Sequence, residues 1–173
     1  MKMDIVAGSK NDEFYTPVYA ITPLLKYLKP MSRIWCPFDT DNSNFVKVLR
    51  EQEHLVLPSH IENGIDFFLV DYSYECDYII SNPPYSLKGK VFDRLFMLKK
   101  PFAMLVGVVG LFESQSRFRM FRDNDFEIMY MSKRVSYFKS YGEQEPSLNP
   151  PFSSVYVCRD ILPKRIVFEE ILK

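Results

Sequence analysis

Short apolar runs alternate with amphipathic stretches along this chain. The apolar runs are rich in aliphatic, β-branched and aromatic residues, so they predict strands at 33–38, 54–59, 77–82, 102–111, 126–131 and 153–159. The amphipathic stretches repeat apolar residues at helical spacing and predict helices at 20–28, 42–52, 86–99 and 114–124. Residues 64–76 fit a loop or a short helix. Alternation of this kind favours an α/β fold with a doubly wound, mostly parallel sheet.

Length and composition restrict the class of protein. A chain of 173 residues is expected to form one domain, 1–173, with a sizeable core. No apolar run approaches membrane-spanning length, and the first residues lack the apolar region of a signal peptide. Cys36, Cys76 and Cys158 are odd in number, widely spaced and without metal-ligand spacing. We therefore expect a reducing, cytoplasmic location and no metal site.

One strand is followed by an unusual turn. The run Asp77-Tyr78-Ile79-Ile80-Ser81 reads as a buried parallel strand, and Asn82-Pro83-Pro84-Tyr85 ends it abruptly, because proline cannot donate a ladder hydrogen bond. The side chains of Asn82 and Tyr85 are then left at the carboxyl end of a central strand. In an open α/β sheet that is where ligands bind.

The string DYIISNPPYS, residues 77–86, resembles the catalytic signature of the S-adenosylmethionine-dependent amino-methyltransferases. Asp/Asn-Pro-Pro-Tyr/Phe after an apolar strand is especially typical of the adenine-N6 DNA methyltransferases, and the compact chain resembles their small phage-type members. The resemblance implies a Rossmann-like methyltransferase fold with an antiparallel last strand. It also implies methyl transfer from S-adenosylmethionine to the N6 amino group of adenine in nucleic acid, with DNA favoured over RNA.

The chemistry of that reaction suits these residue types. An exocyclic amino group is a poor nucleophile because its lone pair is delocalised into the ring. The Asn82 side-chain oxygen and the Pro83 carbonyl are oriented acceptors that can hold the amino hydrogens, and the prolines Pro83 and Pro84 fix the backbone. Tyr85 would stack on a base swung out of its helix. The alternative is a plain strand-terminating turn.

The resemblance extends to a cofactor-binding half. Tyr15-Thr16-Pro17 looks like the Thr-Pro segment that contacts the methionine end of the cofactor in many adenine methyltransferases, although an ordinary helix start fits nearly as well. Pro37-Phe38-Asp39 stands where the family has a strand ending in Asp/Glu-Pro-Phe-x-Gly-x-Gly. Residues 40–44 contain no glycine, which departs from the family. Asn42 or Ser43 would then cap the following helix near the cofactor carboxylate.

Three further residues are assigned to the cofactor by the same resemblance. His60 lies near the end of the second strand, where the family usually places an acidic residue for the ribose hydroxyls, and Glu62 is the alternative. Asp66-Phe67 resembles the pair that brackets the cofactor adenine. A catalytic base is not expected of His60, because amino methylation does not need one.

Charge is uneven although the net charge is zero. Residues 1–85 hold 7 Lys/Arg and 12 Asp/Glu, whereas residues 86–140 hold 11 and 5. The basic residues of the middle part are Lys88, Lys90, Arg94, Lys99, Lys100, Arg117, Arg119, Arg122, Lys133, Arg134 and Lys139. Aromatic residues interleave with them, which is typical of a nucleic-acid face. Solvated helix faces are the alternative.

Other interpretations stay open at this point. A second copy of the pattern, Asn149-Pro150-Pro151-Phe152, follows a polar stretch and reads as a loop that feeds the last strand. No separate target-recognition domain is expected, so weak sequence specificity, a single-stranded or RNA substrate, or a separate specificity subunit would each fit. The same motif occurs in RNA and protein-glutamine methyltransferases. The glycine-free loop also fits a methyltransferase-fold protein that binds no cofactor and acts as a binding or inhibitory module.

Overall fold

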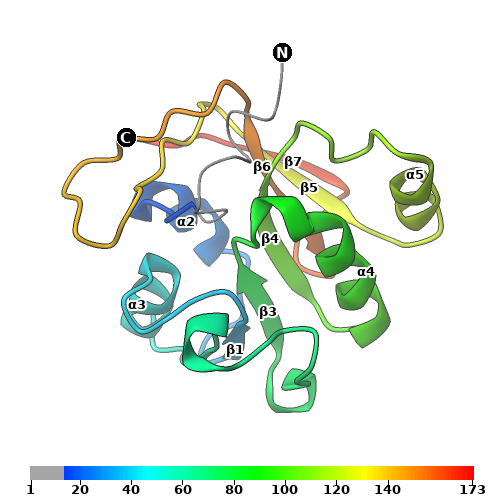
Figure 1. Cartoon of the computed structure of the whole chain (residues 1–173), viewed down its shortest axis with the longest axis horizontal. Helices are drawn as coiled ribbons and strands as arrows, with labels where there is room; N and C mark the ends of the chain where they lie inside the picture. The colour runs from blue at the N-terminus through cyan, green and yellow to red at the C-terminus, as the bar shows by residue number, and fades with distance from the viewer. Residues whose placement is uncertain (1–13) are drawn as a thin grey trace.

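The computed structural model describes residues 14–173, and every structural statement below refers to that part of the chain. Its strands form one sheet in the order β2-β1-β3-β4-β6-β5-β7 (Figure 1). The strands are β1 Arg33–Cys36, β2 Leu55–Pro58, β3 Tyr78–Ser81, β4 Phe102–Gly107, β5 Glu127–Met131, β6 Ser154–Arg159 and β7 Ile166–Glu169. The helices are α2 Val18–Leu25, α3 Asn44–Glu51, α4 Lys88–Leu98 and α5 Gln115–Arg122, with 3-10 turns η1 Ile61–Asn63, η2 Ser73–Glu75 and η3 Tyr85–Leu87.

The pairing confirms the expected Rossmann-like, mostly parallel α/β sheet. β2, β1, β3 and β4 pair in parallel, and β7 pairs in parallel with β5. β6 lies between β4 and β5 and runs antiparallel to both. Its residue Val157 is opposite Met104 of β4 on one side and opposite Ile128 of β5 on the other. The antiparallel strand therefore sits inside the sheet rather than at its edge.

Alternating side chains along the strands build two cores, one on each face of the sheet. Ile80 and Ala103 point into one core, which α2 and α3 cover. Ile79 and Phe102 point into the other core, which α4 and α5 cover. Figure 1 shows the two helix pairs on opposite sides of the strands. Because strand side chains alternate with a period of two, continuous apolar runs of this kind are buried on both faces.

Several boundaries differ from the expected ones. The strand expected at 102–111 ends at Gly107, because the chain turns at Val108 to Leu111. The helix expected at 20–28 is Val18–Leu25, which contains Pro23, and 64–76 holds only the short η2. β7 was not expected: it is a four-residue edge strand after a charged turn, too short to give a clear alternation. Ser114 caps α5 as expected, accepting from the Arg117 backbone N–H.

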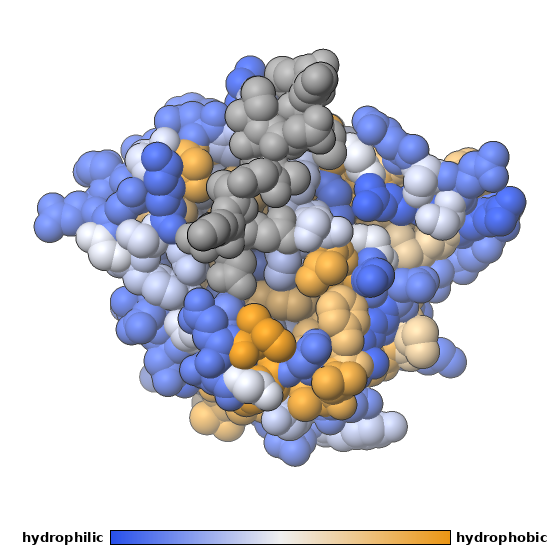
Figure 2. All heavy atoms as spheres, viewed as in Figure 1, coloured by the Kyte–Doolittle hydropathy of each residue, from blue (hydrophilic) through white to orange (hydrophobic). Residues whose placement is uncertain are grey.

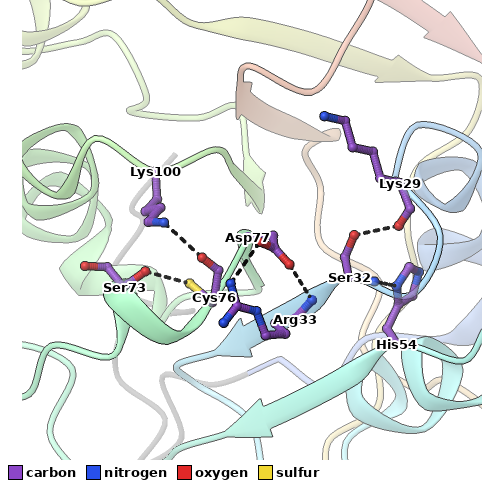
Figure 3. A network of polar contacts seen from close by, with 8 residues as sticks. All are labelled: Lys29, Ser32, Arg33, His54, Ser73, Cys76, Asp77 and Lys100. Carbon is purple, nitrogen blue, oxygen red and sulfur yellow. Dashed lines mark hydrogen bonds and ion pairs between the residues drawn. The ribbon is translucent and has the colours of Figure 1, made fainter.

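A polar network holds the amino ends of the central strands (Figure 3). The Asp77 carboxylate accepts from the Arg33 backbone N–H at 2.8 Å and from its guanidinium at 3.3 Å. His54 Nδ1 accepts from the Ser32 backbone N–H at 3.1 Å, and burial lowers the pKa of His54, so this imidazole serves as a neutral acceptor. Lys100 Nζ donates to the Cys76 carbonyl at 3.0 Å. This end of the sheet is tied together by structural contacts.

The surface carries both hydrophobic and hydrophilic residues. Figure 2 shows hydrophobic residues gathered in the lower middle of one face, over the segment that joins β2 to β3 and the start of α4, with hydrophilic residues around them. Ile61, Leu69 and Tyr74 in this connecting segment are exposed. No helix in residues 14–173 is long and apolar enough to cross a membrane.

Tyr156→Phe is expected to destabilise the fold by about 0.5–1.5 kcal/mol, because a buried hydrogen bond between β6 and α2 is lost. Tyr156 is fully buried on β6, and its hydroxyl donates to the Ala20 carbonyl of α2 at 2.7 Å. Urea unfolding of the variant measures the loss. Tyr130→Phe on the neighbouring strand β5 is the matched control, since that ring is half-exposed. Equal stability of the two variants would contradict this account.

Candidate functional site

The sheet reverses its winding between β1 and β3. β1 connects through α3 to β2 on one side, and β3 connects through α4 to β4 on the other, so a crevice opens at the carboxyl ends of the two strands. Asp39 follows β1, and Ser81 ends β3. The Ser81 hydroxyl donates to the Asp39 carboxylate at 2.5 Å, and both residues are buried. This bond joins the two strand ends across the reversal point.

A cavity of about 150 Å³ lies at this crevice. Its walls come from residues 14–16, from the segment that follows β1, from Asn82 at the end of β3, and from residues 138–143. Of the residues predicted to bind cofactor, Tyr15, Thr16, Phe38 and Asp39 line this cavity, and the predicted catalytic Asn82 lines it with them. Segments from three distant parts of the sequence thus meet at one point.

The Asn82 side chain is held in one orientation. Its Nδ2 donates to the Phe14 carbonyl at 2.8 Å and to Thr16 Oγ1 at 3.1 Å, which uses both amide hydrogens. Oδ1 is left as the acceptor of this side chain. The Thr16 carbonyl in turn accepts from Asn44 Nδ2 at 2.9 Å, so Thr16 links the end of β3 to the start of α3.

Residues 137–148 form a covering segment over the cavity. Tyr137 and Leu148 pair at its base, and Phe138 pairs with Tyr15 through two backbone hydrogen bonds of 3.2 and 2.9 Å. The Tyr141 ring lies 4.1 Å from the Tyr15 ring, centroid to centroid. Sequence reasoning did not identify Tyr141. No local pattern in the sequence signals it, because its partners Thr40 and Ser43 lie far away along the chain.

The loop between β1 and α3 is organised by hydroxyl groups instead of glycines. The Ser43 hydroxyl accepts from the Thr40 backbone N–H at 3.0 Å, and the Tyr141 hydroxyl lies 3.1 Å from the Ser43 hydroxyl and 3.3 Å from that of Thr40. Ser43 occupies the cap position of α3, but its side chain makes no capping hydrogen bond. Ser43 is therefore the N-cap residue of α3, one of the two expected candidates, but it does not cap the helix through its side chain.

The other residues assigned to the cofactor lie outside this cavity wall; they are Pro17, Pro37, His60, Asp66 and Phe67. Phe67 is buried behind Phe38, with ring centroids 5.0 Å apart, and it also packs on Trp35. Its ring therefore supports the Phe38 side chain that lines the cavity. A pattern of apolar residues along the sequence cannot distinguish a ring that lines the cavity, such as Phe38, from a ring that packs behind it, such as Phe67.

His60 and Asp66 stabilise turns between β2 and β3. His60 is buried, and its Nδ1 accepts from the Glu62 backbone N–H at 3.0 Å at the start of η1. The Asp66 carboxylate accepts from the Phe68 backbone N–H at 2.9 Å. Both side chains thus make local contacts of the kind that polar residues make in turns.

The predicted catalytic turn lines a second, very small cavity of about 10 Å³. Pro83 and Tyr85 are in its wall, whereas Pro84 precedes η3. The Phe152 ring covers Tyr85, with centroids 5.5 Å apart and planes tilted by 35°. Phe152 belongs to the second Asn-Pro-Pro-Phe copy, which is a loop before β6 as expected and also packs on the first copy. Burial raises the pKa of Tyr85, so the phenol stays neutral.

Lys88, at the start of α4, points inward at this turn. It is only 3% exposed, and its Nζ donates to the Val109 carbonyl at 2.6 Å and to the Gly107 carbonyl at 3.3 Å. The same Nζ lies 4.4 Å from the centroid of the Tyr85 ring. Burial, and then the neighbouring Arg117 charge, lower the pKa of Lys88 to about 8.

The basic residues of the middle segment do not form one face. Four of them donate to backbone carbonyls: Lys88, Arg94, Lys100 and Arg117. Arg117 also lines an open groove of about 600 Å³ between α4 and α5, together with Lys90 and with Ser86, which directly follows Tyr85. The groove also carries Asp93 and Glu113, so its charge is mixed.

Comparisons with known proteins agree with the fold. No protein-family model matches the chain, and no curated protein is significantly similar to it. Among solved structures, it is similar to a modification subunit assigned to a type I restriction enzyme of Vibrio vulnificus YJ016, with a TM-score of 0.50 and 14% identity. The match covers 97% of this chain, which spans about half (49%) of that subunit. The shared feature is the methyltransferase-type α/β fold.

Burial of Lys88 predicts a specific pH dependence of stability. The pKa of Lys88 is about 8 in the folded protein, against 10.5 for an ordinary lysine, so between these values the unfolded chain binds more protons. Stability relative to Lys88→Met should therefore rise with pH above 8, by at most about 1.4 kcal/mol per pH unit. Urea unfolding of both proteins at pH 7 to 10 measures the difference.

Lys90→Met is the matched control, because Lys90 is exposed on the same helix. A stability difference between the native protein and Lys88→Met that stays constant across this pH range would contradict the prediction.

Proposed function

We propose that the protein is an S-adenosylmethionine-dependent methyltransferase that acts on the exocyclic N6 amino group of adenine in nucleic acid, with DNA as its substrate. The observation that carries the proposal is the oriented Asn82 amide. It stands at the carboxyl end of β3, beside a cavity at the point where the sheet reverses its winding.

The residues of the turn suit the handling of an amino group. Asn82 Oδ1 and the Pro83 carbonyl accept the two amino hydrogens and favour a nitrogen lone pair that points towards the cavity. Tyr85 stacks on the base in place of Phe152, whose ring lies against Tyr85 in this structure. No residue is required as a strong base, which agrees with the positions of His54 and His60 in structural contacts.

The cavity chemistry fits S-adenosylmethionine, which supplies an electrophilic methyl group when bound. Asp39 provides a carboxylate, Thr16 a hydroxyl, and Tyr15, Phe38 and Tyr141 provide aromatic walls. The volume of about 150 Å³ is smaller than the roughly 300 Å³ at which small-molecule sites begin. The covering segment 137–148 must therefore shift for the whole cofactor to enter.

One observation favours a second function. Both cavities are small, at about 150 and 10 Å³, and aromatic rings fill the space around the catalytic turn. A methyltransferase-fold binding or inhibitory module that takes no cofactor would show the same closure. Cofactor binding separates the two functions.

The proposed function is tested by calorimetric titration with S-adenosylmethionine and by transfer of tritiated methyl groups to unmethylated plasmid DNA, native and heat-denatured. RNA and protein acceptors are assayed in parallel, because those substrates define the alternative methyltransferase classes.

Asn82→Ala should lower transfer by about 100-fold or more, since an oriented acceptor is lost. A fully active Asn82→Ala protein would refute the mechanism. Absence of heat on titration, with no transfer, would favour the binding module.

A second prediction concerns the nucleic-acid strand beside the target base. The groove between α4 and α5 adjoins the catalytic turn through Ser86, so we expect a phosphate to lie near Arg117. Arg117→Gln should weaken binding to all sequences alike and lower the slope of log affinity against log salt by about one. Fluorescence anisotropy with labelled oligonucleotides at several salt concentrations measures both effects.

Arg122→Gln is the matched control on the same helix, because Arg122 is exposed and pairs with Asp123 at 2.7 Å. Equal effects of the two variants would place the strand elsewhere.

A further inference from the structure

One buried charge has no part in the chemistry proposed above. Lys88 follows η3, whose first residue is Tyr85, and it lies inside the protein although lysine is rarely buried. An ammonium group in such a place needs partners for its three hydrogens. The partners of Lys88 identify the elements that it joins.

Two of these partners are backbone carbonyls on the next strand connection. Gly107 ends β4, and Val109 lies in the turn that follows it. The same Nζ atom lies over the Tyr85 ring, 4.4 Å from its centroid, which is within the range of a cation–π contact. Lys88 thus connects the catalytic turn after β3 to the carboxyl end of β4.

The contact matters for the ring that would receive a base. The Phe152 ring lies against Tyr85 at 5.5 Å, and Lys88 provides a further contact to the same ring. If a base replaces Phe152, the ammonium still holds Tyr85 in place. A ring held in this way loses less side-chain freedom when a base stacks on it.

We propose that Lys88 is a positioning residue for the target base: its ammonium holds the Tyr85 ring against the carboxyl end of β4 in the arrangement that accepts an unstacked base. This role rests on the proposed function and deepens it, because it makes target capture depend on the charge of a buried group. The cofactor cavity, whose wall does not include Lys88, is not affected.

The charge of Lys88 can change within an accessible pH range. Its pKa of about 8 results from burial, with Arg117 lowering it further and Glu113 raising it. The phenols of Tyr85 and Tyr137, which line the same pocket, have pKa values raised by burial and stay neutral there. Lys88 is therefore the group in this pocket expected to lose its charge as the pH rises past 8.

The test compares Lys88→Met, Lys88→Arg and Lys100→Met in methyl transfer to unmethylated plasmid DNA. Lys100 is the matched control, because it also donates to a backbone carbonyl but lies at the opposite end of the strands (Figure 3). Lys88→Met should raise the KM for DNA on the order of tenfold, as expected for a lost cation–π contact at a desolvated site. The affinity for S-adenosylmethionine, measured by calorimetry, should stay within about twofold, since Lys88 is outside that cavity.

The pH profile gives a readout that a purely structural role would not produce. At subsaturating DNA, transfer by the native protein and by Lys100→Met should fall as the pH rises past 8. Lys88→Arg should keep its rate there, because a guanidinium stays charged. This comparison remains decisive if Lys88→Met does not fold.

Three results would overturn the inference. A KM for DNA in Lys88→Met equal to that of Lys100→Met would exclude positioning. So would an equal loss of affinity for S-adenosylmethionine and DNA, which indicates general disruption. Identical pH profiles for the native protein and Lys88→Arg would exclude a role for the charge. If the native protein transfers methyl groups, any of these three results overturns the role of Lys88 alone and leaves the proposed function standing. If the native protein transfers none, the proposed function and the role of Lys88 are overturned together.

Discussion

The hydrogen bonds from the Asn82 amide to Phe14 and Thr16 hold the candidate site together. They attach the segment before α2 to the carboxyl end of β3, across 68 and 66 residues of sequence. That segment pairs with Phe138 and so carries the covering segment 137–148 over the cavity. Without these bonds, nothing in the turn itself would fix which side of the Asn82 amide faces a substrate.

The fold and the centre of the site were predictable because they depend on local patterns. An apolar strand followed by Asn82-Pro83-Pro84 has few structural alternatives, and its place at the strand end follows from the sheet topology. The positions of His60 and Phe67 were not predictable in this way. Whether a side chain lines a cavity or lies one layer behind it depends on packing between distant segments, as the contact of Phe67 with Phe38 shows.

Charge read along the sequence was a poor guide to charge in space. Lys88 and Lys100 belong to the same basic stretch, yet Lys88 is buried beside the turn that follows β3, whereas Lys100 anchors the opposite end of the sheet. A lysine has a long apolar stem, so the backbone position of the residue does not determine where its ammonium group lies. Only the partners of each ammonium group separate a structural lysine from one that acts on a site.

The chain contains the pattern Asn-Pro-Pro-Tyr/Phe twice, at 82–85 and 149–152, and the two copies have different structural roles. The first follows β3 and presents Asn82 to the cavity, whereas the second places Phe152 against Tyr85 and over Gly107. A Cβ atom at Gly107, the last residue of β4, would lie 2.5 Å from the Phe152 ring, so a larger residue there would displace that ring. Phe152 is separated from the covering segment, which holds Tyr141, only by Asn149, Pro150 and Pro151. One continuous stretch, 137–152, therefore closes both cavities, and any ligand larger than either must displace part of it.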